Sequence, residues 1–478
     1  MPEILTWQWI ILLSFSFILI AMTPFVKTKE SFYRGTSLKA KKPGTLMLTF
    51  SLVISWIFAK SVTNAANLGM EFGIVGGLAY ATYYFSFLVA GIIIYKIRTR
   101  LNVQSLHQFL EKKFGTAAVK IFTLVIAVRL LNEVWSNTEV IGTYFGHAGS
   151  PQYIISIIVF TVLTLAYALK GGLRSSLITD LLQMGLFAVL LFIVMHMILP
   201  EEGSVEPFLT SGHWSFNGGM DILLVAFIQV FSYPFHDPVL TDRGFISDEK
   251  TALRSYIYAT AIGFVCILLF SFVGIYAKML GLQGQAAVEV SKTLGLFSMV
   301  VMNFIMVTSA SSTVDSTFAS VSKLIVIDLG KKEYASVSKG RLVMIFTALG
   351  GTIPLFFSPA ILSATTISGT LVLGFAPVFI FWKLRAPRIS FHLAVWTGVF
   401  SSIIYTFGLL PKSLYLTNGR YADLLAINIY ATAVILIVYF IPVLLMKEKI
   451  SMLPAVNEAA GKRIDVPLWT RNSIDDME

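Results

Sequence analysis

Charge and cysteine are both scarce in this chain. Only 13% of its 478 residues are charged, and it has a single cysteine, Cys266. One cysteine excludes a disulfide and a cysteine-based metal site within the chain. The 6 histidines are scattered, and neither a His-Glu-x-x-His nor a Gly-x-Ser-x-Gly stretch occurs. These absences argue against a membrane enzyme, and the chain is predicted not to be one.

Apolar residues dominate what is present. They make up 56% of the chain, and the mean hydropathy is +0.77. Runs of this length and character predict an all-α polytopic membrane protein with about thirteen transmembrane helices. The expected segments lie near residues 6–26, 44–67, 74–97, 116–145, 152–169, 175–200, 219–235, 252–281, 291–328, 340–357, 359–383, 389–411 and 422–446.

The net charge of +10 reflects topology rather than a nucleic-acid partner. The Lys and Arg residues gather in short gaps between apolar segments, which the positive-inside rule places in the cytoplasm. This predicts a cell-membrane protein with its N-terminus outside and its C-terminus in the cytoplasm. The first segment is expected to be an anchor and not a cleaved signal, because Glu3 precedes it and its basic residues follow it. The polar tail 447–478 is expected to be disordered and too short for a signalling domain, which disfavours a transporter-like sensor.

Two segments are expected to be broken. The first holds Ser, Thr and Asn side chains between Ala59 and Gly69, and the second holds Pro234 and Pro238, which cannot continue a regular helix. Each opens a block of five apolar segments, so the second block would be inverted relative to the first, and unwound helices would form a central binding site. A transporter follows from this plan. The expected divisions are 1–43 (extra helix and basic loop), 44–200 (first repeat), 201–218 (extracellular loop), 219–411 (second repeat), 412–446 (extra helix) and 447–478 (tail).

Lys60 lies inside the first broken segment, close to Asn64. An ionisable group at the centre of a bilayer costs about 2.5–3.5 kcal/mol on insertion scales and usually lines a solute pathway or pairs with an opposite charge. Lys60 is therefore the first candidate for a binding residue.

A second polar stripe runs along the segment 116–145. Its members recur at three- and four-residue spacing and must face protein or water: Arg129, Asn132, Glu133, Ser136, Glu139 and Thr143. Arg129 and Glu133 could pair only for packing. The same stripe also offers donors and acceptors to a polar or zwitterionic solute.

A third group has the chemistry of an alkali-cation site. Asp180 lies within an apolar helix and needs a cation, a proton or a donor cluster. Another segment supplies hydroxyl groups on one helical face with a carboxylate beside them: Ser309, Ser312, Thr313, Asp315 and Ser316. Hard oxygen ligands of this kind suit sodium better than a transition metal. Alone, the serine-rich helix could instead be a close-packing face.

The chain resembles the sodium:solute symporter family over residues 44–411. Four motifs occur in the family's order: Ser55-Trp56, Ser105 to Gly115, Gly171-Gly172 to Thr179-Asp180 with Gln183, and Ser312-Thr313-x-Asp315-Ser316 with Ile327-Asp328. The resemblance implies the LeuT-type fold, a 5+5 inverted repeat whose first and sixth core helices are broken. It also implies cation-coupled symport, with Na+ as the coupling ion and no organic cofactor.

The resemblance further implies the sodium ligands. The family's site corresponds here to the backbone carbonyls of Ala59, Val62 and Ser309 with the hydroxyl groups of Ser312 and Thr313. A second sodium in some members corresponds to Asp180, Asp315 and Ser316. Cation binding would favour the outward-open form, which is a population shift set by differential affinity.

Lys60 departs from the family pattern and leaves three interpretations open. Its ammonium group could replace sodium beside Asp180 or Asp315, or lose its proton and couple transport to H+. It could face the substrate cavity opposite Glu133 or Glu139 and bind a solute carboxylate. It could also form a purely structural ion pair.

The solute itself is only broadly constrained. A small amphipathic pocket is expected from Trp135, Asn137, Tyr233, Phe235 and Asp237. The residues that mark sugar-transporting members of the family have no counterparts here, so a hexose is disfavoured. An amino acid, a carboxylate or a urea-like solute fits equally well.

Overall fold

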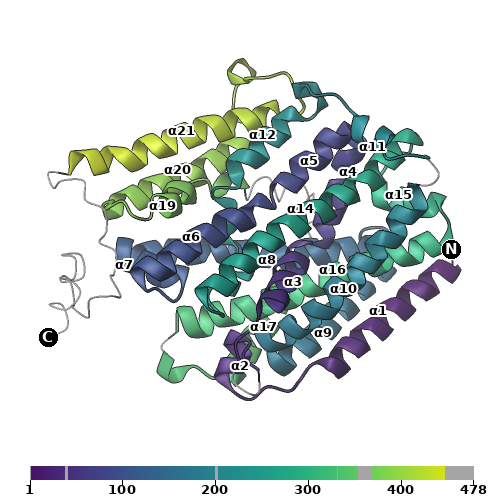
Figure 1. The fold of residues 1–478 in the computed structure, drawn as a ribbon, viewed down its shortest axis with the longest axis horizontal. Coiled ribbons are helices and arrows are strands. Elements are labelled where there is room, and N and C mark those ends of the chain that lie inside the picture. The colour runs from purple at the N-terminus through teal and green to yellow at the C-terminus, as the bar shows by residue number, and fades with distance from the viewer. Residues whose placement is uncertain (1, 38–40, 200–202, 331, 354–368, 447–478) are drawn as a thin grey trace.

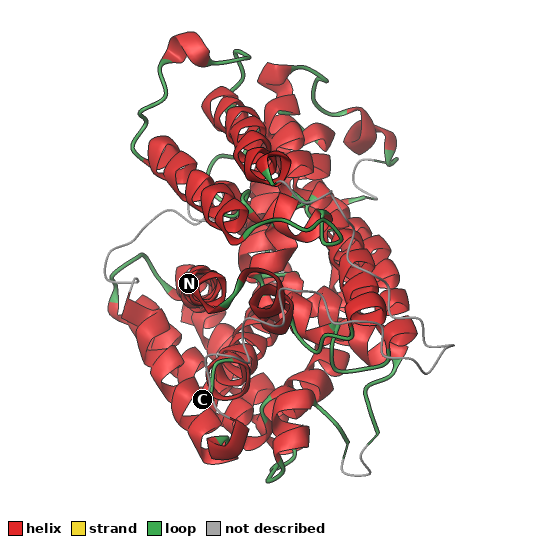
Figure 2. Ribbon diagram, turned by 90° about the vertical axis from the view of Figure 1, so that its left-hand side faces the viewer, coloured by secondary structure: helices red, strands yellow, loops and turns green. Residues whose placement is uncertain are grey.

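The computed structural model describes residues 2–37, 41–199, 203–330, 332–353 and 369–446. Within these ranges the chain consists of helices joined by loops and has no strand (Figure 2). The first half contains α1 (Pro2–Met22), α2 (Lys29–Arg34), α3 (Thr45–Trp56), α4 (Ala59–Phe72), α5 (Ile74–Thr82), α6 (Phe85–Leu101), α7 (Leu106–Phe114), α8 (Thr116–Phe145), α9 (Pro151–Gly171) and α10 (Leu173–Ile198).

The second half begins after a loop that holds a short helix. It contains α11 (Glu206–Thr210), α12 (Met220–Gln229), α13 (Pro238–Arg243), α14 (Glu249–Met279), α15 (Ala286–Thr293), α16 (Leu296–Lys323), α17 (Val337–Thr352), α19 (Phe375–Ile380), α20 (Arg388–Thr406) and α21 (Ala422–Leu445). Short 3₁₀ turns are η1 (Phe216–Gly218), η2 (Tyr233–His236), η4 (Lys332–Tyr334) and η6 (Lys412–Leu414), and η3 (Leu324–Asp328) is a π turn that ends α16.

Eight of these helices are long and apolar enough to cross a membrane, or nine if the bent pair α3 and α4 counts as one span. The prediction of about thirteen spans stays a prediction, because parts of the expected segments 340–357 and 359–383 lie outside the described residues, as does the tail 447–478. The helices form one bundle (Figure 1), with α1 at one edge and α20 and α21 at the opposite edge. The helices that carry the predicted polar residues run through the interior: α3, α4, α8, α10 and α16.

Local sequence explains where many helices begin. Ser105, Ser150, Asp248 and Ser336 each precede a helix and accept a hydrogen bond from a backbone amide of its first turn. Such caps satisfy amides that have no partner within the helix.

The tightest packing in the bundle is between α4 and α14. A β carbon added at Gly274 would overlap the carbonyl oxygen of Ala66, and one added at Gly69 would overlap the backbone of Ser271. Small residues at both positions let the two backbones approach closely, which is the usual basis of helix association in membranes. This contact fixes the position of α4, and with it the position of Lys60.

Replacing Gly274 with valine should therefore lower the melting temperature of the detergent-solubilised protein. The added side chain forces α4 and α14 apart, and overpacking of this kind costs about 1–3 kcal/mol. Gly185→Ala in α10 is the matched control, because an added β carbon there meets nothing within 4 Å. Equal melting temperatures for Gly274→Val and the wild type would contradict the close approach of the two helices.

Candidate functional site

The first core helix is broken between α3 and α4, whose axes differ by 61°. The break lies at Ile57 and Phe58, ahead of the polar stretch from Ala59 to Gly69 in which it was predicted. That stretch is a regular helix because its polar side chains find partners without disturbing the backbone. Thr63 donates to the Ala59 carbonyl at 3.1 Å, and the Tyr80 hydroxyl contacts Ser61 at 3.2 Å. The predicted position of the first break was wrong by a few residues.

The second break lies where the prolines predicted it. Helix α12 ends at Gln229, η2 contains Pro234, and α13 begins at Pro238. Asp237 caps α13, because its Oδ1 accepts a hydrogen bond from the Leu240 amide at 3.3 Å. The break thus turns a carboxylate toward α3 and α8.

Four charged side chains meet between the two breaks, and we call Lys60, Arg129, Glu133 and Asp237 the charge quartet. Lys60 Nζ lies 2.6 Å from Glu133 Oε1, Arg129 also pairs with Glu133, and Arg129 Nη2 lies 3.3 Å from Asp237 Oδ2. All four side chains are 1% exposed. Trp56 Nε1 donates to Asp237 at 2.8 Å. Lys60 thus lies opposite Glu133, as both the solute-binding and the structural interpretation expect, and is not paired with Asp180 or Asp315 among the described residues.

The predicted stripe on α8 is in fact two neighbouring faces. Arg129, Glu133 and Ser136 are buried, whereas the other three predicted members are half-buried: Asn132, Glu139 and Thr143. Trp135 belongs with the second face, and its Nε1 donates to Glu139 at 3.1 Å. Asn137 lies on the first face and donates to Glu133 Oε2 at 3.2 Å.

An aromatic cavity of about 20 Å³ adjoins the quartet. Its lining residues come from both broken helices, from α5 and from the turn that joins α5 to α6: Trp56, Phe58, Ser61, Tyr80, Tyr83, Tyr84 and Tyr233. Asn64 reaches it through the Tyr80 hydroxyl, at 3.4 Å. Two residues predicted for the pocket lie elsewhere, because Phe235 stacks on Phe379 with ring centroids 4.3 Å apart and Trp135 contacts Glu139.

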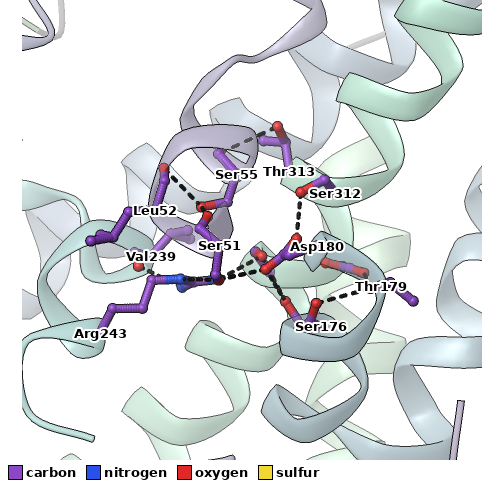
Figure 3. A network of polar contacts seen from close by, with 12 residues as sticks. Ser51, Leu52, Ser55, Ser176, Thr179, Asp180, Val239, Arg243, Ser312 and Thr313 are labelled. Carbon is purple, nitrogen blue, oxygen red and sulfur yellow. Dashed lines mark hydrogen bonds and ion pairs between the residues drawn. The ribbon is translucent and has the colours of Figure 1, made fainter. Parts of the chain in front are cut away.

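The second cluster surrounds Asp180 (Figure 3). Asp180 accepts hydrogen bonds from Ser51 at 2.5 Å and Ser312 at 2.6 Å, and it lies 3.5 Å from Arg243 Nη2. Arg243 also donates to the hydroxyls of Ser51 and Ser316, both at 2.8 Å. The three helices α3, α10 and α16 thus converge on one carboxylate and one guanidinium group, both fully buried.

Sequence reasoning missed Arg243, Ser51 and Ser176. Arg243 occupies the place that one interpretation gave to Lys60, a fixed cation beside Asp180. The signal was available, because Arg243 follows the Pro238 break and an intramembrane guanidinium needs a partner as much as an ammonium does. Ser176 in α10 finds its partner on another helix, because its hydroxyl lies 2.8 Å from the hydroxyl of Ser316 in α16.

The predicted sodium ligands lie around the break in α3 and α4. Thr313 Oγ1 donates to the Ser309 carbonyl at 3.0 Å and lies 3.4 Å from the Ser55 carbonyl. The Ser309 hydroxyl has no hydrogen-bond partner among the described residues. Asp315 accepts from Thr179 at 2.9 Å through one oxygen, and its other oxygen is likewise without a partner in the described part of the chain.

Two curated proteins resemble parts of this chain, and no protein-family model matches it. A putative sodium-dependent multivitamin transporter from Drosophila melanogaster is 25% identical over 186 residues, which are 38% of this chain and 30% of that protein. Solute carrier family 5 member 4 from Rattus norvegicus is 24% identical over 192 residues, 40% of this chain and 28% of that protein. The matches span under a third of the length of either relative.

Solved structures match over most of the chain. A Na+-coupled sialic acid symporter in a substrate-bound outward-open state has a TM-score of 0.65 at 14% identity, covering 94% of this chain and 98% of its own. MhsT in complex with L-phenylalanine has a TM-score of 0.55 at 14% identity, covering 83% and 98%. Mhp1, a nucleobase-cation-symport-1 family transporter, has a TM-score of 0.54 at 12% identity, covering 87% and 94%.

These likenesses confirm the predicted fold class. All of the matched proteins named here are transporters or solute carriers and none is an enzyme, in agreement with the sequence-based expectation. The chain is a multi-pass membrane protein with the LeuT-type fold, and part of it is similar in sequence to a putative sodium-dependent transporter and to a solute carrier.

Proposed function

We propose that the chain is a secondary active transporter that couples sodium to the symport of a small polar organic solute by alternating access. The observation that carries this proposal is that α3 links the two buried clusters. Its Ser51 holds Asp180, and its last residue, Trp56, holds Asp237 of the charge quartet. A cation bound beside Asp180 would therefore act on the solute site through α3, from Ser51 in the middle of that helix to Trp56 at its end.

The sodium ligands that we propose are oxygen atoms around the first break. They are the backbone carbonyls of Ala59, Val62 and Ser309 with the hydroxyl groups of Ser312 and Thr313. The position of Thr313 supports this assignment, because its hydroxyl lies 3.0 Å from the Ser309 carbonyl and 3.4 Å from the Ser55 carbonyl, at the first break. A second sodium would bind between Asp180, Asp315 and Ser316, where one oxygen of Asp315 is unpartnered among the described residues.

One contact favours a second candidate function. Arg243 already places a positive charge beside Asp180, so sodium must displace its guanidinium group or do without this carboxylate. If Arg243 stays in place and the first site binds no sodium either, the chain is a sodium-independent or proton-coupled transporter of the same fold. The built-in cation at Asp180 is then Arg243 and not Lys60, which pairs with Glu133.

For the solute we propose the cavity between the two breaks. The residues that reach it or the quartet beside it are Lys60, Asn64, Arg129, Glu133, Asn137, Tyr233 and Asp237. The quartet balances two positive against two negative charges, which suits a solute with polar groups at one end. An amino acid, a carboxylate and a urea-like solute all meet this description.

We further propose that the N-terminus lies outside and the C-terminus in the cytoplasm of a cell membrane. A cavity of about 740 Å³ opens at the end of the bundle that holds α2 and α7, and Lys29, Arg34 and Lys120 line it. Basic residues mark the cytoplasmic side. Lys323 also lines this cavity and pairs with Asp242 at 2.5 Å and Asp328 at 3.2 Å. We assign the cavity to the inner vestibule.

Cysteine labelling tests this orientation, because the native Cys266 is buried. A membrane-impermeant maleimide applied to intact cells should label Trp214→Cys, at a side chain 63% exposed, and should label Lys120→Cys only after permeabilisation. Labelling of Lys120→Cys alone in intact cells would mean that the chain has the opposite orientation.

The coupling itself is tested by accumulation in proteoliposomes. Radiolabelled amino acids, carboxylates and urea are offered under an inward sodium gradient, a matched potassium gradient and a proton gradient. The proposal expects at least one solute to accumulate above equilibrium only with sodium. Accumulation driven by protons and indifferent to sodium would instead support the second candidate.

A further inference from the structure

Hydrogen-bond donors exceed acceptors in the charge quartet. Lys60 carries three N–H donors and Arg129 carries five. Asp237 has little capacity to spare, because Oδ1 caps α13 and Oδ2 accepts from Trp56 and Arg129. This carboxylate is therefore committed to holding the second break in shape.

Glu133 is left to serve both cations. Its Oε1 receives Lys60 and Arg129 together, and its Oε2 receives Asn137. Glu133 Oε1 is the only hydrogen-bond acceptor of Lys60 among the described residues, and Arg129 Nε has none there. Two buried cations thus share one carboxylate oxygen and keep N–H groups to spare, although buried donors normally find acceptors.

The spare donors lie beside the aromatic cavity. The Phe58 ring lines that cavity and also lies 4.9 Å from Lys60 Nζ and 5.5 Å from the Arg129 guanidinium carbon. Arg129 also lies 5.6 Å from the Tyr233 ring, another part of the lining. The cavity of about 20 Å³ has room for about one water, so these rings must move apart to admit a solute, and an anion entering past Phe58 would then reach both cations with the rest of the molecule among the rings.

We propose that the solute is a small monocarboxylate with an apolar or planar body, and that its carboxylate bridges Lys60 and Arg129. This inference rests on the proposed transport function and names its substrate class. Both cations have enough donors to keep Glu133 while they bind the solute, and bidentate guanidinium–carboxylate geometry strengthens the contact. A free ammonium group on the solute finds no matching acceptor surplus, which disfavours an amine or an amino acid.

Charge balance connects this inference to sodium. The quartet is neutral when its four members are ionised, so a bound monocarboxylate leaves it with one negative charge. Sodium at the neighbouring site restores neutrality, and opposite charges in a low-dielectric interior attract more strongly than in water. The two ligands should therefore increase each other's affinity by the same factor, as linkage requires.

The test uses the purified full-length chain and four matched probes: phenylacetate, phenylacetamide, phenylglycine and benzylamine. In the presence of sodium, phenylacetate should raise the melting temperature, whereas phenylacetamide and benzylamine should not. Phenylglycine, which adds an ammonium group to phenylacetate, should bind more weakly. Equal stabilisation by phenylacetate and phenylacetamide, stronger binding of phenylglycine, or no response to phenylacetate would each overturn the proposal.

Variants separate solute binding from structural support. Lys60→Met should weaken phenylacetate binding about tenfold to a hundredfold, the range for losing one charge-assisted hydrogen bond. Lys60→Arg should restore most of it. The readout is the difference between carboxylate and amide within each variant, so a change in basal stability does not affect it. If the difference in stabilisation between phenylacetate and phenylacetamide is the same in Lys60→Met as in the wild type, Lys60 does not bind the carboxylate.

Adding sodium without any solute separates a failure of the proposed substrate class from a failure of the proposed transport function. If sodium alone stabilises the protein and phenylacetate does not, the substrate class is wrong and the coupled function stands. If neither ligand stabilises it, both proposals fail.

Discussion

Glu133→Gln should lower the free energy of unfolding more than any other single change in the charge quartet. The substitution keeps the shape of the side chain but leaves Lys60 and Arg129 without the anion that they share. Breaking a buried ion pair by removing one partner costs about 3–5 kcal/mol. Denaturation of the detergent-solubilised protein measures the loss, and Glu289→Gln is the matched control, because its pair with Lys292 lies at the surface.

The double variant Lys60→Met with Glu133→Gln gives the sharper result. Removing one cation together with the anion relieves the unpaired charge, so the double variant should be less destabilised than the sum of the two single variants. Interaction energies between contacting residues are typically about 0.5–3 kcal/mol. Strict additivity would mean that Lys60 and Glu133 do not form the pair described here.

Asp180→Asn should weaken the stabilisation of the protein by sodium, because it removes a ligand of the second site and the hydrogen-bond acceptor of Ser312, a ligand of the first. A ligand present at a hundred times its dissociation constant adds about 2.7 kcal/mol to the stability of the folded state, and the share that the second site contributes should disappear. The variant should also lose basal stability, because Arg243 loses its carboxylate partner. Melting temperatures in sodium chloride and in potassium chloride of equal ionic strength measure both effects.

Arg243→Gln tests the competition from the opposite side. Removing the guanidinium group leaves Asp180 and Ser316 free to bind a cation, so the affinity for sodium should rise. The control Glu289→Gln should respond to sodium as the wild type does. A sodium response in Asp180→Asn equal to that of the wild type would show that Asp180 is not a ligand of the coupling ion.

The sequence predicted the chemistry of the site better than its contacts. Intramembrane charges such as Lys60, Arg129, Glu133 and Asp180 must be paired or solvated wherever they lie, so their importance could be inferred without a structure. Which charge pairs with which depends on how the helices rotate against one another, and that depends on packing such as the approach of α4 to α14. Lys60 therefore pairs with Glu133 and Arg243 with Asp180, although both cations were available to either acid.

The position of the first break shows a similar limit. Ser, Thr and Asn residues from Ala59 to Gly69 have weak helix propensity, yet tertiary partners such as Tyr80 satisfy them within a regular helix. The prolines at the second break act through the backbone itself, so Pro234 and Pro238 marked the right place. The placement of Trp135 was open to correction from spacing alone, because a residue two positions from Glu133 lies on nearly the opposite face of a helix.

Direct binding of radioactive sodium to the purified protein tests the central claim most directly. Saturable binding to the wild type, weakened in Asp180→Asn and tightened by phenylacetate, is the result that sodium-coupled symport predicts. No saturable sodium binding to a folded wild-type protein would contradict it, and would leave Arg243 as the permanent cation of the Asp180 site.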